Sequence, residues 1–220
     1  MRIALLGLTG SGKSALGNTL LGKTNFHSVP ASGSVTLTCN TAEAVLESGR
    51  KIMVADTPGV YDTANVCMID EVKKFFQFLA PGPHALLIVL PPNRISTRDI
   101  NILDELQNFF DDNHFLKYTI LVFTRKNDII GDEPEDSKDI HAFIEKYAHD
   151  DIKKLYNNCG RRAIAVENKQ KWEERKIDAN GVFKTIDKID GIYDHDYFLK
   201  AKENTELKKA LEKRSSCDIM

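Results

Sequence analysis

The segment Gly7–Ser14, with the sequence GLTGSGKS, carries the residue types that bind phosphate. It matches the pattern G-x-x-x-x-G-K-[ST], in which glycines let backbone N–H groups turn inward around phosphate oxygens. We expect Lys13 to reach the β- and γ-phosphates as a catalytic group and Ser14 to give a hydroxyl ligand to Mg²⁺. A chance glycine-rich turn is the alternative, but an apolar run precedes the segment and a helical pattern follows it. The residues expected to contact the nucleotide here are Gly7, Thr9, Gly10, Ser11, Gly12, Lys13, Ser14 and Ala15.

A second segment, Asp56–Gly59 (DTPG), follows the strand-like run 51–55. An aspartate at the end of such a strand holds Mg²⁺ through water, so we expect Asp56 to be a metal-binding residue. Gly59 is expected to donate its backbone N–H to the γ-phosphate during catalysis. The D-x-x-G pattern alone is common in turns. Its position at a strand end downstream of Lys13 favours a nucleotide site.

A third segment, Arg125–Asp128 (RKND), comes just after the apolar run 120–123 and is a variant of the base-recognition pattern N-K-x-D. The carboxylate of Asp128 can accept hydrogen bonds from guanine N1–H and N2–H₂. Adenine lacks that donor pair, so Asp128 would select GTP over ATP. The aliphatic stem of Lys126 is expected to pack on the base, beside Arg125. A charged loop after a strand is the alternative reading.

Two further residues complete the predicted pocket. Thr36 lies in a Gly/Ser-rich stretch after the first predicted helix, where a threonine can bind Mg²⁺ in the GTP state and release it after hydrolysis. An ordinary loop threonine is the alternative. Asn168 follows the strand-like run 162–166 and can help to hold the base, although lone asparagines at strand ends are usually turn formers.

These residues need a scaffold that brings strand ends together. Strand-like and helix-like segments alternate over the first 166 residues, which predicts an α/β fold: a mostly parallel six-stranded sheet with one antiparallel edge strand and helices on both faces. The run 37–46 is separated from its neighbour by only three residues and should form the antiparallel hairpin. The predicted strands are 2–7, 37–46, 50–55, 84–90, 116–123 and 162–166, and the predicted helices are 13–22, 67–79, 97–111 and 136–156.

The pattern changes after residue 166. Apolar residues recur at helical spacing from Val182 to Tyr197 among many charges, and we expect Asp190-Gly191 to interrupt this helix. We therefore expect three parts: a GTP-binding domain over 1–170, a C-terminal helical extension over 171–214, and a flexible tail over 215–220.

Composition excludes several classes of protein. The chain has 220 residues, of which 42% are hydrophobic and 28% charged, as in ordinary globular proteins. A net charge of −2 argues against a general nucleic-acid binder, so we expect no nucleic-acid partner. The four cysteines form no CxxC pair, and the apolar runs are too short to span a membrane.

Several strings resemble the immunity-associated GTPases (GIMAP or AIG-type), which belong to the septin- and chloroplast-import-receptor-like branch of G proteins. The resemblance covers residues 1 to about 170, and its most specific part is the box Gly82–Ala85, which generic small GTPases lack. The strings that carry it are 34–39 (SVTLTC), 56–63 (DTPGVYDT), 81–87 (PGPHALL) and 123–126 (FTRK).

The resemblance implies binding of GTP and GDP, GTP-controlled homodimers or oligomers formed through the nucleotide face, and membrane attachment in many members. It also implies that Glu167 and Asn168, which stand where the family has an Asn-Asn pair, lie near the base.

Hydrolysis is expected to be slow, because Val60 stands where many GTPases have a water-orienting glutamine. Arg94, just past a buried strand, is a candidate arginine finger across a dimer, an effect worth about 10³–10⁵ in rate; a locally paired surface arginine is the alternative. His84 is either a general base or, more often for such a residue, a structural histidine.

The last four residues, Cys217–Met220 (CDIM), match the C-a-a-X prenylation pattern, so Cys217 is a candidate lipidation site. The segment 200–214 has six basic and three acidic residues, and its positive charge would add a second attraction to anionic lipid. We expect a cytoplasmic protein attached peripherally to the cytosolic face of a membrane.

The leading interpretation is a Mg²⁺-dependent GTPase switch that self-associates at a membrane. The alternatives are a GTP-dependent oligomeric scaffold with little hydrolysis and a P-loop kinase of small molecules.

Overall fold

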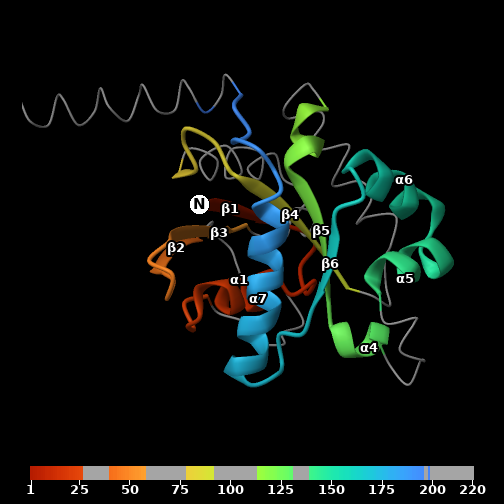
Figure 1. Cartoon of the computed structure of the whole chain (residues 1–220), viewed down its shortest axis with the longest axis horizontal. Coiled ribbons are helices and arrows are strands. Elements are labelled where there is room, and N and C mark those ends of the chain that lie inside the picture. The colour runs from red at the N-terminus through yellow and green to blue at the C-terminus, as the bar shows by residue number, and fades with distance from the viewer. Residues whose placement is uncertain (27–39, 58–77, 92–112, 131–138, 196–197, 199–220) are drawn as a thin grey trace, which may run out of the picture.

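The computed structural model describes residues 1–26, 40–57, 78–91, 113–130, 139–195 and 198 (Figure 1). Its centre is a six-stranded sheet in the order β2-β3-β1-β4-β5-β6. All neighbouring strands are parallel except β2 and β3, which are antiparallel. The predicted sheet, with one antiparallel strand at its edge, is confirmed. The strands are β1 (Arg2–Leu6), β2 (Asn40–Val45), β3 (Lys51–Asp56), β4 (Ala85–Leu90), β5 (Thr119–Thr124) and β6 (Ala163–Val166).

The central strands are buried on both sides, which is why they read as continuous apolar runs. Every residue of β4 and β5 is buried. Alternate side chains of these strands enter two different hydrophobic clusters, as the two-residue repeat of a strand requires. Leu87 and Val122, for example, face one layer of helices, and Ile88 and Leu121 face the other.

One layer is formed by α1 (Lys13–Leu21) and α7 (Trp172–Ile186), which contact each other. Leu16 of α1 and Val182 of α7 lie in the same buried cluster as Ile3 and Leu5 of β1. The opposite layer is formed by α5 (Ile140–Tyr147) and α6 (Asp150–Asn158) (Figure 1). Helices therefore cover both faces, as predicted.

The prediction of one helix over 136–156 was wrong over its described part. Two helices occupy this region, and the chain becomes extended at Ala148 and His149 between them. The carboxylate of Asp139 caps α5 by accepting from the N–H of His141, and the ring of His149 accepts from the N–H of Asp151 to cap α6. Side-chain acceptors at these positions satisfy first-turn N–H groups and so favour a new helix start.

The strand predicted to begin at residue 116 begins instead at Thr119, because a 3₁₀ helix, η1 (His114–Tyr118), precedes it. A short helix that was not predicted, α4 (Lys126–Ile130), follows β5. The predicted helix 97–111, most of the predicted helix 67–79 and the first residues of the predicted strand 37–46 lie outside the described residues.

Helix α7 ends at Ile186, four residues before the predicted interruption. Beyond it the chain crosses to the start of β4, where the N–H of Tyr193 donates to Pro83 O at 2.8 Å. Tyr193 and Phe198 are buried against Leu79 and the η1 region. Because α7 shares its core with the sheet, the boundary near residue 170 does not divide the hydrophobic core; the division into domains stays a prediction.

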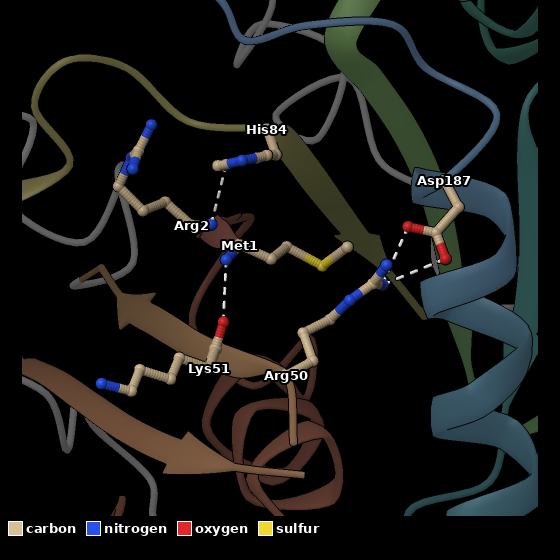
Figure 2. A network of polar contacts seen from close by, with 6 residues as sticks. All are labelled: Met1, Arg2, Arg50, Lys51, His84 and Asp187. Atoms are coloured by element: carbon tan, nitrogen blue, oxygen red, sulfur yellow. Dashed lines mark hydrogen bonds and ion pairs between the residues drawn. The ribbon is translucent and has the colours of Figure 1, made fainter. Parts of the chain in front are cut away.

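His84 lies at the amino end of β4, at the edge of the sheet away from the Gly7–Ser14 loop. Its Nδ1 accepts a hydrogen bond from the N–H of Arg2 at 2.9 Å (Figure 2). In the same view the amino group of Met1 donates to Lys51 O at 2.8 Å. Burial and the neighbouring positive charges lower the pKa of His84 to about 4. These contacts give His84 a structural role.

Among the described helices, none is long and apolar enough to cross a bilayer.

Candidate functional site

The loop Gly7–Ser14 connects β1 to α1 at the carboxyl edge of the sheet, beside the ends of β3, β4 and β5. Its glycines are required by space as well as by conformation. A Cβ on Gly7 (φ 149°) would lie 2.6 Å from Val89 O, and a Cβ on Gly12 (φ 100°) would lie 3.0 Å from the methyl group of Thr124. The loop thus packs against two neighbouring strand ends while its backbone turns as a phosphate cradle requires.

Thr124, the last residue of β5, holds this loop in place. Its hydroxyl donates to Ser11 O at 2.8 Å and lies 3.4 Å from Leu90 O. The side chain is buried, so the bond also satisfies a carbonyl that has little access to water. The sequence offered only one hint of this role, a threonine at a strand end directly before the predicted base-recognition segment.

Lys13 lies across the loop. Its ammonium donates to Gly7 O at 2.9 Å and to Leu8 O at 2.8 Å, and the residue is buried. A buried ammonium needs such partners because its transfer out of water is costly. That the same ammonium reaches phosphate oxygens stays a prediction of the sequence.

Ser14 and Asp56 meet at the amino end of α1. The Ser14 hydroxyl donates to Asp56 Oδ2 at 2.6 Å, and Asp56 is only 1% exposed. Burial raises the pKa of the Asp56 carboxyl, while the Ser14 hydrogen bond and the Lys13 charge oppose that rise. Within the described residues, Asp56 Oδ1 and the Ser11 hydroxyl are buried without a hydrogen-bond partner.

This arrangement fits Mg²⁺ and a phosphate group. A carboxylate and a hydroxyl converge, and both are oxygen ligands of the kind that Mg²⁺ prefers. One buried carboxylate oxygen lacks a partner in the part of the chain that the structure describes. Ser14 would bind the ion directly and Asp56 through water, with the remaining positions left to phosphate oxygens and water. Unsatisfied buried polar atoms are rare in folded proteins and call for such an explanation.

The predicted base-recognition segment lies at the same edge of the sheet, after β5. Arg125 has a positive φ of 54°, and Lys126 begins α4, so the segment forms a helix start. The N–H of Asp128 donates to Arg125 O at 2.9 Å. The Asp128 side chain is exposed, as a residue that receives a base must be before the base binds.

Lys126 and Glu167 are joined by Asp178, a residue of α7 that the sequence did not single out. The Lys126 ammonium lies 2.8 Å from Asp178 Oδ1, and the N–H of Glu167 donates to Asp178 Oδ2 at 2.9 Å. Asp178 is 6% exposed. Asp178 stands four residues before Val182 and eight before Ile186, on the helix face that enters the core, and an acidic residue on that face was the signal that could have revealed it.

Glu167 binds the protein backbone. Its Oε2 accepts from the N–H of Asn127 at 3.2 Å and its Oε1 from the N–H of Lys169 at 3.0 Å. The side chain is 5% exposed. Its contact with the base stays a prediction, while the structure shows that it links the start of α4 to the segment 167–169.

Asn168 is tied to the helix that follows the phosphate loop. The Thr19 hydroxyl donates to Asn168 Oδ1 at 2.8 Å. Arg175 of α7 donates to the same hydroxyl oxygen from two nitrogens, and its guanidinium lies 3.8 Å from the centre of the Trp172 ring. Neither Arg175 nor Trp172 was predicted to belong to the site.

The structure thus brings the described residues that were predicted to bind phosphate, metal and base to one edge of the sheet. Four other predicted residues, Thr36, Gly59, Arg94 and Cys217, lie outside the described residues, as does Val60.

Comparison with known proteins finds similar sequences within one family. The family model described as "AIG1 family" matches residues 1–216. Immune-associated nucleotide-binding protein 7 from Arabidopsis thaliana is 33% identical over 97% of this chain and 70% of its own length. Protein 9 of the same series is 32% identical over 80% of this chain, which spans about half (51%) of it. GTPase IMAP family member 8 from Mus musculus is 29% identical over 88% of this chain and 28% of its own length.

Among solved structures, a dimerization-deficient mutant of Toc33 from Arabidopsis thaliana has a TM-score of 0.65 and 20% identity, covering 86% of this chain and 83% of that chain. A structure of Toc33 in complex with GDP and Mg²⁺ has a TM-score of 0.63 and 19% identity, with the same coverage. At this level of identity the likeness establishes a shared fold.

Proposed function

This chain belongs to the AIG1 family, and we propose that it binds GTP and GDP with Mg²⁺ and hydrolyses GTP slowly. One observation carries the proposal: the Ser14–Asp56 pair, in which one buried carboxylate oxygen has no partner among the described residues, lies at the same edge of the sheet as Lys13 and the RKND segment. A site with both a phosphate-and-metal end and a base end is what a nucleotide needs.

Each residue then has a chemical task. The Lys13 ammonium leaves the carbonyls of Gly7 and Leu8 for phosphate oxygens, so that one set of acceptors replaces another. Ser14 and Asp56 would hold Mg²⁺, the hydroxyl as a direct ligand and the carboxylate through water. Asp128 accepts from guanine N1–H and N2–H₂. When bound, Mg²⁺ neutralises charge on the β- and γ-phosphate oxygens.

A direct test is titration of the protein with GDP and ADP, with and without Mg²⁺. Strong preference for GDP and dependence on Mg²⁺ are expected, and Lys13→Ala should abolish tight binding. Equal binding of ADP, or tight binding of ATP and a small-molecule acceptor, would instead favour the kinase alternative.

In addition to nucleotide binding, we propose that the protein turns GTP over slowly and self-associates. Val60 provides no group to orient water, and Arg94 is the candidate to supply charge across a dimer. The solved Toc33 chain is named as a dimerization-deficient mutant, which supports looking for a dimer here. Turnover that rises more than linearly with protein concentration, and loses that rise in Arg94→Ala, is the expected result. Strictly linear activity would reject it.

The scaffold alternative differs in what the nucleotide does. Measurement of particle size with GDP and with a non-hydrolysable GTP analogue distinguishes the two. Assembly with the analogue and measurable turnover per dimer support a switch, whereas assembly with negligible turnover supports a scaffold.

Membrane attachment through Cys217 stays a prediction of the sequence. Mass spectrometry of the protein from cells tests it. A farnesyl group on Cys217 is expected, and an unmodified Cys217–Met220 end would reject the prediction.

A further inference from the structure

We propose that Asp178, on α7, is a positioning residue that holds the two base-recognition segments, 125–128 and 167–169, in register and thereby sets the preference for guanine. The inference rests on the proposed function, since it assumes that these segments receive the base. No part of Asp178 needs to touch the nucleotide.

The carboxylate of Asp178 uses both of its oxygens, one for each segment. Oδ1 lies 2.8 Å from the Lys126 ammonium, and Oδ2 accepts from the backbone N–H of Glu167 at 2.9 Å. Asp178 is 6% exposed and Lys126 is 33% exposed, so the pair is sheltered on the aspartate side. Charge-assisted bonds in such surroundings are stronger than those at an open surface.

Glu167 connects the same two segments a second time. Its buried carboxylate accepts from the N–H of Asn127 on one segment and from the N–H of Lys169 on its own. Lys126, Asp178, Glu167 and Asn127 therefore form a closed set of contacts. If Asp178 is lost, the backbone N–H of Glu167 loses its hydrogen-bond acceptor on α7. Glu167 is then held less firmly, and so is Asn127, whose N–H its carboxylate accepts.

Helix α7 provides a rigid base for this brace. Val182 and Phe183, on the same helix, are buried in the core beneath the sheet. One turn before Asp178, Arg175 donates to the Thr19 hydroxyl on α1, the helix that follows the phosphate loop. A carboxylate anchored on such an element can hold a loop more accurately than one on another loop can.

The test compares GDP with IDP, whose base lacks the exocyclic N2 amino group. Asp178→Asn keeps the volume of the side chain but removes its charge. We expect GDP affinity to fall about tenfold, as for loss of a charge-assisted hydrogen bond, and the ratio of GDP to IDP affinity to fall with it. If the substitution only disturbs the fold, a smaller fraction of the protein is able to bind nucleotide. The apparent affinities for GDP and IDP then fall by the same factor, and their ratio stays unchanged.

Asp187→Asn is the matched control. Asp187 directly follows α7 and pairs with Arg50 at 2.8 Å, but this pair is exposed and lies with the His84 contacts (Figure 2). Its loss should leave both nucleotide affinities unchanged. If Asp178→Asn does not fold, Lys126→Met removes the same ion pair from the other side and should lower the ratio similarly.

The outcomes separate the two ideas. Wild-type protein that binds GDP, IDP and ADP equally would overturn the proposed guanine site. Wild-type protein that prefers GDP, with a variant that keeps the same GDP-to-IDP ratio, would overturn the role of Asp178 and leave the guanine site standing.

Discussion

The hydroxyl of Ser14 donates a 2.6 Å hydrogen bond to Asp56 Oδ2. Ser14 lies in the first turn of α1 and Asp56 is the last residue of β3, so the two are far apart in the sequence. Parallel pairing of β1 and β3, which sets Leu5 opposite Asp56, brings them together. The pair occupies the place where we propose that metal and phosphate meet, and Asp56 Oδ1 remains without a partner in the described residues.

Removal of the Ser14 hydroxyl should uncouple nucleotide binding from Mg²⁺. Ser14→Ala deletes one oxygen ligand, so we expect the gain in GDP affinity on adding Mg²⁺ to fall at least about tenfold, the size of one hydrogen bond to a charged group. Ser14→Thr keeps the hydroxyl and should retain most of the gain. Calorimetric titration with GDP, with Mg²⁺ and with EDTA, measures it. Equal Mg²⁺ dependence in Ser14→Ala and wild type would contradict the metal site.

Thr124→Val should weaken nucleotide binding as well as stability. The valine has the same shape but cannot donate to Ser11 O, so we expect a loss of about 1–3 kcal/mol in unfolding free energy for the unpaired buried carbonyl. Because that carbonyl belongs to the phosphate loop, GDP affinity should also fall.

The control for Thr124 lies at the other end of the same strand. Thr119 is equally buried and donates to Phe115 O at 2.9 Å, far from the loop. Thr119→Val should cost similar stability, measured by urea unfolding, without changing GDP affinity in the native range. Equal losses of affinity in both variants would show that the Thr124 bond does not act through the loop.

Gly82→Ala should destabilise the fold and release the segment around Tyr193. A Cβ on Gly82 would lie 2.0 Å from Tyr193 O, at a φ of 146°, so the crossing chain must move. We expect a loss of more than about 2 kcal/mol and faster proteolysis near residue 193. Gly49 also has a positive φ but open space around it, so Gly49→Ala should cost only about 1 kcal/mol of backbone strain. Equal costs in the two variants would argue against the close contact.

Acidification should destabilise the protein partly through His84. The pKa of His84 is lowered to about 4 by burial and by the charges of Arg2, the N-terminus and Arg50, against an ordinary value of 6.5. Between these values the unfolded chain binds the proton and the folded chain does not, so stability falls as the pH falls from about 6.5 towards 4. The loss should be on the order of 1–2 kcal/mol, since the ring is partly exposed.

Urea unfolding at pH 7, 5.5 and 4.5 measures this effect. His84→Asn offers an acceptor that does not titrate in this range, so its stability should depend less on pH than that of wild type. Parallel pH profiles for the two proteins would mean that His84 does not carry the effect.

The sequence alone predicted the sheet and the chemistry of the main motifs. Continuous apolar runs such as 85–90 identify strands buried on both faces, and the spacing of glycines, Lys13 and Ser14 identifies the phosphate loop. Both signals are local: each depends on residues that are close together in the chain. The break between α5 and α6 was missed because its only local signals are the capping residues Ala148, which ends α5, and His149, which begins α6. The apolar residues on both sides keep a helical spacing, and that pattern was the stronger signal.

Only the tertiary structure decided how these motifs are held. Asp178 meets Lys126 across 52 residues of sequence, and the Thr124 hydroxyl meets Ser11 O across 113. No spacing rule predicts such pairs, because they depend on the order of the strands and on which face of α7 packs against the sheet. The sequence determined which groups can bind a nucleotide, and strand pairing and helix packing decided which side chains hold those groups in place, since these contacts exist only once the core has formed.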